Sequence, residues 1–147
     1  MLYPQAYDIT FGTYMARPPV GNKPHVDRDH NQYRTPLAPT EPLLENWVRQ
    51  HARQDTVVLT IEQRKLVEEA IGDLAQRYRW SIHAIAPMRD HVHVVVGAAR
   101  EGVQLREGIK AVASKWLNKK YGKRTWWAEG GSARYFWERK YFENAVA

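Results

Sequence analysis

The sequence predicts an α+β domain in which helices pack on one face of an antiparallel sheet. Two observations lead to this class. Segments rich in β-branched and aromatic residues alternate with two long segments whose apolar residues recur at helical spacing. The predicted elements run strand, loop, helix, strand, strand, helix, strand, and only a short turn separates the two central strands. With 147 residues, of which 44% are apolar, the chain is expected to form a single domain, 1–147.

The first predicted strand covers residues 6–14, where Ile9 and Phe11 fall on one face. From 17 to 42 the composition shifts to Pro, Gly, Asn, Asp and His, which predicts a long surface loop. Loops of this length in small domains often carry function. A short helix at 43–53 and a brief extended stretch at 57–59 are expected to follow.

Two long helices are predicted from their capping signals and periodicity. Thr60-Ile61-Glu62-Gln63 matches a capping box, in which the Thr hydroxyl and the Gln side chain each satisfy a free backbone N–H. Apolar residues then recur at helical spacing to about Tyr78. The second helix is expected from Gly102 to about Tyr121, with Gly122 as its C-terminal stop.

The remaining elements are strands. Segments 80–86 and 91–97 are predicted as antiparallel partners around a turn at 87–90. Aromatic residues at 126–127 and 135–137 flank a Gly-Gly-Ser turn and are expected to form a last hairpin or strand pair. A final short helix is expected to begin near Phe142.

Composition narrows the classes of function. The chain has no cysteine, which excludes disulfides, cysteine zinc sites and thiol catalysis. Neither a membrane-length apolar run nor a signal peptide is visible, so we expect a cytoplasmic protein with no membrane partner. The net charge of +6 and the pI near 9.7 indicate a polyanionic partner.

The sequence His91-Val92-His93 is the most informative local feature. Side chains alternate along a strand, so the two imidazoles are expected on one face and could together bind a divalent cation. The alternative is a pair of half-buried sheet histidines. Candidates for a further ligand are Asp8, His83 and Asp90, although strand alternation predicts that Asp90 points away from the two histidines.

The C-terminal third is basic and aromatic. Between 101 and 147 there are ten Lys plus Arg against five Asp plus Glu. Cations can follow a phosphate backbone while aromatic rings stack on unpaired bases, so this region predicts binding to single-stranded nucleic acid. The alternative is a solvated helix face, with Trp116, Trp126 and Trp137 packed in the core. The candidate phosphate-binding residues are Lys110, Lys115, Lys119, Lys120, Lys123 and Arg124.

The segment Arg89-Asp90-His91-Val92-His93-Val94-Val95-Val96 resembles the HUH motif of single-tyrosine transposases, an insertion-sequence family that includes the REP-associated tyrosine transposases. The resemblance extends over nearly all of the chain, because the segments 9–14, 26–31 and 131–137 are also similar to bacterial transposase-like proteins. One departure is Asp90, since the family usually has Asn before the first histidine.

This resemblance implies a ferredoxin-like α+β fold, the HUH nuclease fold, in a homodimer that cuts and rejoins single-stranded DNA at hairpin-bearing ends. It implies that His91 and His93 hold Mg²⁺ or Mn²⁺, which polarises the scissile phosphate. A tyrosine then attacks the phosphorus and forms a 5′-phosphotyrosine bond.

The expected nucleophile is the main departure from the family. There it lies on the last helix, often with a Gln four residues later on the same helical face. Here that helix is expected to begin at Phe142, so the tyrosine would come just after Ala147. Either the native chain continues or the nucleophile and third ligand are absent. Tyr141 is the nearest substitute, followed by Tyr135 and Tyr121.

Three functions compete at this point. The first is a transposase-like HUH nuclease and strand transferase. The second is a catalytically inactive DNA-binding module derived from such an enzyme. The third is an unrelated cupin-like or hydrolytic metal enzyme, which would need a third histidine in a later strand, and no histidine follows His93.

Overall fold

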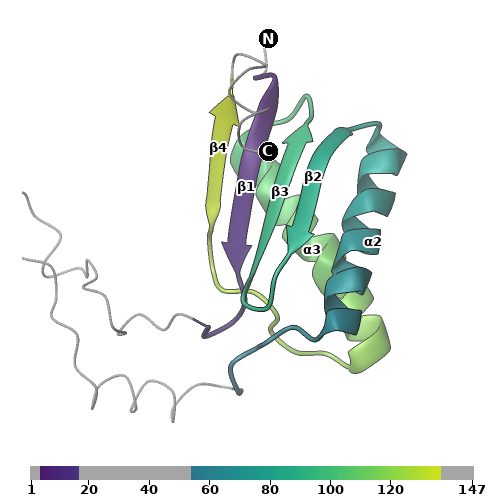
Figure 1. Ribbon diagram of the computed structural model, residues 1–147, viewed down its shortest axis with the longest axis vertical. Coiled ribbons are helices and arrows are strands. Elements are labelled where there is room, and N and C mark those ends of the chain that lie inside the picture. Colours follow the sequence, from purple (N-terminus) through teal and green to yellow (C-terminus); the bar gives the residue numbers. More distant parts are fainter. Residues whose placement is uncertain (1–3, 17–53, 137–147) are drawn as a thin grey trace, which may run out of the picture.

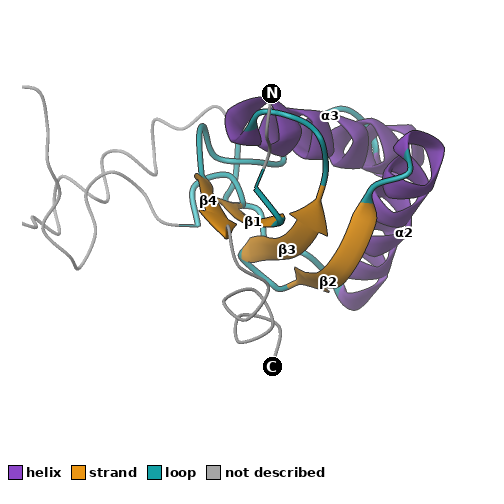
Figure 2. Cartoon of the chain, turned by 90° about the horizontal axis from the view of Figure 1, so that it is seen from above, coloured by secondary structure: helices purple, strands orange, loops and turns teal. Residues whose placement is uncertain are grey.

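A computed structural model describes residues 4–16 and 54–136, which form a four-stranded antiparallel sheet covered on one face by two helices (Figure 1). Figure 2 shows both helices on the same side of the sheet, so the predicted fold class is confirmed. The predictions for 17–42, for 43–53 and for the helix near Phe142 lie outside the described residues. The elements are β1 (Ala6–Gly12), α2 (Ile61–Tyr78), β2 (Ser81–Pro87), β3 (His91–Gly97), α3 (Gly102–Tyr121) and β4 (Ser132–Phe136).

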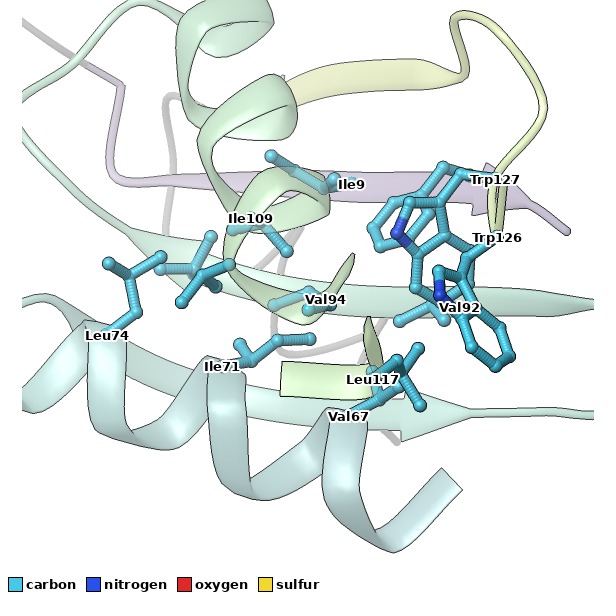
Figure 3. Close-up of a cluster of buried hydrophobic side chains, with 14 of the residues drawn as sticks. Ile9, Val67, Ile71, Leu74, Val92, Val94, Ile109, Leu117, Trp126 and Trp127 are labelled. Carbon is cyan, nitrogen blue, oxygen red and sulfur yellow. The ribbon is translucent and has the colours of Figure 1, made fainter. Parts of the chain in front are cut away.

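Strand β3 lies inside the sheet, whose order is β2-β3-β1-β4. Its register with β1 pairs Val94 with Ile9 and His93 with Thr10. Because successive side chains alternate, Val92 and Val94 point toward the helices, where both are completely buried. Figure 3 shows these two valines packed among Ile9 and side chains from α2 and α3. The two histidines therefore occupy the other face of the sheet.

Helix α2 begins at the predicted capping box. The backbone N–H of Gln63 donates to the Thr60 hydroxyl, and the Thr60 N–H donates to the Gln63 side chain. At the other end Arg79 adopts a left-handed conformation, with φ of 57°. None of the helices in the described part of the chain combines the length and apolarity that crossing a membrane requires.

The two adjacent tryptophans fill the core instead of forming a hairpin with β4, so that prediction is wrong. Strand β4 pairs with β1, and Trp127 makes only an isolated bridge to Thr13. Both indoles are buried and their N–H groups find partners: Trp126 donates to the Asn118 side chain and Trp127 to the backbone carbonyl of Lys110. Because the core buries both indoles and satisfies their N–H groups, the two tryptophans pack there and do not form a strand beside β4. The core alternative is thus confirmed for Trp126.

Lys110 differs from the other predicted phosphate-binding residues because it is buried. Only 8% of the residue is exposed, and its ammonium donates to the carbonyls of Ala128 and Gly130, each at 2.9 Å. These bonds fix the turn before β4 to α3, where Gly131 lies so close to Thr10 that a Cβ would sit 2.5 Å from its carbonyl oxygen. Lys110 therefore stabilises the fold, and the proposed DNA contacts do not include it.

Glu107, one turn before Lys110 on α3, places a negative charge beside the Lys110 ammonium. Its carboxylate accepts a hydrogen bond from Arg106 at 3.1 Å and lies 3.4 Å from the Lys110 ammonium. Burial acts to raise the pKa of Glu107, but the Arg106 hydrogen bond and the Lys110 charge outweigh it and lower the pKa.

Replacing Lys110 by Met should lower the free energy of unfolding by about 1–3 kcal/mol, because two carbonyls lose their buried donor. Chemical denaturation followed by circular dichroism measures the change. Lys115→Met on the exposed face of α3 is the matched control and should stay within about 0.5 kcal/mol of the unchanged protein. Equal stability of the two variants would contradict the structural role of Lys110.

Candidate metal and DNA site

The two histidines of β3 lie on the sheet face that the helices leave open. Their side chains are partly accessible, with 38% of His91 and 30% of His93 exposed. The intervening valine anchors the strand in the core beneath them. The structure thus places both predicted histidines on one face, held by a rigid strand in the interior of the sheet.

A carboxylate contacts each imidazole. His91 donates from Nδ1 to Asp90 at 2.8 Å, and His93 donates from Nε2 to Asp8 on the neighbouring strand β1. A carboxylate only accepts hydrogen bonds, so these contacts leave Nε2 of His91 and Nδ1 of His93 with free lone pairs. The predicted orientation of Asp90 is wrong because Asp90 lies in the turn before β3, where strand alternation does not apply.

His83, the other candidate ligand, lies far from this pair. It occupies the irregularity in β2 where the register with β3 shifts between Ile82 and Ala84. Its Nε2 is 3.8 Å from the position that a Cβ would take on Gly97, at the opposite end of β3 from His91. The structure does not place His83 near the histidine pair. Asp8, another of the candidate ligands, contacts His93 instead.

The turn that carries Asp90 is fixed by hydrogen bonds to two distant segments. Thr13, which is buried, donates its backbone N–H to the Asp90 carbonyl at 2.9 Å and its hydroxyl to the Val57 carbonyl at 2.7 Å. The Leu59 N–H donates to the carbonyl of Arg89 at 2.8 Å. Sequence reasoning missed Thr13, because its partners are 44 and 77 residues away.

The arrangement can supply two oriented nitrogen ligands to a divalent cation. Histidines that bind metals commonly donate their other ring N–H to a carboxylate, which fixes the tautomer and the ring orientation. Across residues 4–16 and 54–136, no group of three His, Asp or Glu side chains is positioned to hold a metal ion. The pair fits a cation whose remaining positions are filled by water, substrate or other groups.

The predicted basic residues of α3 lie on the other side of the sheet from the histidines. Lys115, Lys119 and Lys120 are exposed on this helix, which packs on the buried face. Lys123 and Arg124, just after α3, return toward the end of the sheet where β3 begins. Arg124 donates to the carbonyl of Asp55 at 3.4 Å, and its guanidinium lies 5.0 Å from the ring centre of Trp126.

The described tyrosines are all on the helix side of the sheet. Tyr135 pairs with Tyr7 in the β1–β4 register and shares its face, and the Tyr7 hydroxyl donates to the carbonyl of Arg100. Tyr121 ends α3 with its ring 6.4 Å from that of Trp126. Tyr14 packs against the same core, and Tyr78 ends α2. None of these five faces the histidines, while Tyr141 lies outside the described residues.

Comparison with known proteins gives a consistent result. The family model described as IS200-like transposase matches residues 48–147. No curated protein sequence matches the chain.

Two solved structures resemble the chain over nearly all its length. One is a REP-associated tyrosine transposase bound to a REP hairpin, with TM-score 0.56 and 12% identity, covering 99% of this chain and 66% of that one. The other, from Deinococcus radiodurans R1 and provisionally classed as a transposase, has TM-score 0.54 and 15% identity, covering 98% and 92%. This chain thus spans just under two thirds of the first neighbour. At these identities the likeness establishes a shared fold.

Replacing Asp8 by Asn should weaken Mn²⁺ binding about 10- to 100-fold, because His93 loses the charged acceptor that orients its ring. Isothermal titration calorimetry measures the affinity. Asp73→Asn is the matched control: this carboxylate pairs with Arg77 on the surface of α2. Wild-type affinity in Asp8→Asn would show that Asp8 does not position His93 for metal binding.

Proposed function

Because the chain belongs to the IS200-like transposase family, we propose that it is a transposase-like endonuclease and strand transferase that acts on single-stranded DNA. The observation that carries the proposal is the pair of carboxylate-bound histidines, His91 and His93, on the open face of the sheet. Two oriented and partly exposed imidazoles suit a metal-assisted reaction at a phosphodiester.

We propose that His91 and His93 hold Mg²⁺ or Mn²⁺. When bound, the cation would neutralise charge on the phosphoryl oxygens of the scissile group. Asp90 and Asp8 would keep the free ring nitrogens turned toward it. Imidazole is a softer ligand than the oxygens that Mg²⁺ prefers, so we expect Mn²⁺ to bind this pair more tightly than Mg²⁺.

The proposed reaction transfers a phosphodiester to tyrosine. The tyrosine hydroxyl loses its proton as its oxygen forms a bond to phosphorus, the bond from phosphorus to the 3′-oxygen breaks, and that oxygen takes up a proton to give a free 3′-hydroxyl. The 5′-phosphotyrosine conserves the energy of the broken bond for rejoining. A phenol with a pKa of about 10 is a weak nucleophile at neutral pH, so stabilisation of the phosphoryl oxygens must supply much of the rate.

The proposed nucleophile is a tyrosine outside the described residues, because every described tyrosine lies on the helix side of the sheet. Of the tyrosines outside the described residues, Tyr141 is the proposed candidate in this sequence. The placement of the described tyrosines also favours a second candidate function, a DNA-binding module without cleavage activity.

The proposed DNA partner is a single strand that bears a hairpin. The hairpin in the first structural neighbour supports this choice. Exposed cations at the C-terminal end of α3 are proposed to contact its phosphates, since clustered Lys and Arg attract a polyanion. Assembly as a homodimer stays a prediction. The proposed contacts are Lys115, Lys119, Lys120, Lys123 and Arg124.

Changing His91 and His93 together to Ala should abolish Mn²⁺ binding and DNA cleavage while leaving most DNA affinity, because other residues hold the phosphates. Calorimetry measures metal binding, fluorescence anisotropy measures DNA binding, and denaturing gels measure cleavage of hairpin-bearing single strands. His83→Ala, at the far end of the sheet, is the control and should match the unchanged protein. Undiminished metal binding in the double variant would refute the site.

Incubation with hairpin-bearing single-stranded DNA and Mn²⁺ should yield a covalent protein–DNA adduct. Nuclease digestion followed by peptide mass spectrometry should place the phosphate on a tyrosine after residue 136. An adduct on Tyr121 or Tyr135 would contradict the face assignment. Tight DNA binding by the full native chain with no adduct and no cleavage would favour the binding module.

A further inference from the structure

A cavity of about 460 Å³ opens beside His91, where the turn between β2 and β3 meets the start of α2. Its lining joins two arginines, Arg64 and Arg89, to Asp90 and His91. We propose that these arginines bind a backbone phosphate of the DNA strand next to the proposed metal site. The inference rests on the proposed function and adds a positioning role for two residues that the motif does not include.

Arg64 lies at a position where a positive charge does not stabilise the helix. It follows the capping box in the first turn of α2, at the positive end of the helix dipole, where a basic residue is unfavourable. Its Nε is buried and has no hydrogen-bond partner. This nitrogen is not accessible from the cavity, so the terminal N–H groups of Arg64, which lines the cavity, are the donors proposed to meet a ligand.

Arg89 lines the same cavity and lies on a backbone that is fixed by hydrogen bonds. The carbonyl of Arg89 accepts from Leu59, and the next carbonyl, of Asp90, accepts from Thr13. Within the described part of the chain, neither Arg89 nor Arg64 forms a side-chain ion pair. The carboxylate of Asp90 accepts the hydrogen bond from His91, so the cavity is lined by two guanidinium groups and one carboxylate that is already engaged.

The cavity chemistry fits an anionic group such as a phosphodiester, because two guanidinium groups line it. A guanidinium presents paired N–H donors that match phosphate oxygens and remains charged at all relevant pH values. Val58 and Met88 contribute apolar wall, which strengthens charge interactions beside it. Because His91 lines the same cavity, a phosphate held here would be close to the scissile group on the strand.

The test compares Arg64→Gln and Arg89→Gln with Lys65→Gln, an exposed neighbour on α2 that does not line the cavity. The probe is a pool of single-stranded DNA oligonucleotides of random sequence, with a chelator present so that no metal contributes. Affinity is measured by fluorescence anisotropy over a salt series. Because the two arginines share one phosphate, each arginine variant should lower the slope of log affinity against log salt by up to about 0.7, the value for one phosphate contact on a single strand.

The control Lys65→Gln should keep the wild-type slope, and Arg64→Lys should largely restore it because the charge returns. Circular dichroism confirms that each variant is folded. The inference would be overturned if both Gln variants had the same slope as Lys65→Gln. If the protein still bound DNA and still needed His91 and His93 for cleavage, the proposed function would stand. Absence of DNA binding by the wild-type chain would overturn the proposed function with it. Competition by inorganic phosphate with unchanged slopes would identify a free-phosphate site and overturn the assignment to DNA.

Discussion

The alternation of side chains along β3 is the constraint on which the rest of the structure depends. Val92 and Val94 are completely buried against the helices, and their burial fixes which face of the strand points away from the helices. A register shift of one residue would bury both imidazoles and expose the valines, at a large cost in hydrophobic free energy. The packing of the core therefore sets the orientation of His91 and His93, and the site inherits the rigidity of the sheet interior.

A second layer of constraint comes from buried polar contacts at one end of the sheet. Thr13 links the end of β1 to residue 57 and to the turn that holds Asp90. Because its hydroxyl and N–H are both used in a buried setting, displacement of any of the three segments would leave unsatisfied groups. The backbone of Asp90, whose carboxylate contacts His91, is thus held in place by hydrogen bonds from distant segments.

Local sequence signals were sufficient for part of the fold and of the site. The capping box at Thr60, the glycine after Tyr121 and the short turn between β2 and β3 act through neighbours in sequence, so α2, α3 and the hairpin could be predicted. The pairing of β4 with β1 could not, because it joins segments more than a hundred residues apart. The Asp8 contact could not be predicted either, because it depends on the long-range register between β1 and β3. The burial of Lys110 depends on where the turn before β4 lies, which is likewise set by residues distant in sequence.

The sheet separates the two surfaces that a DNA-processing protein would use. The histidines occupy the open face, and Lys115, Lys119 and Lys120 follow a helix on the covered face. A strand that contacts both must therefore pass around an edge or an end of the sheet. The end where β3 begins offers a basic residue along such a route, because Arg124 follows α3 and reaches the carbonyl of Asp55. The cavity that Arg64 and Arg89 line lies at this end too, so positive charge extends from the helix layer toward His91.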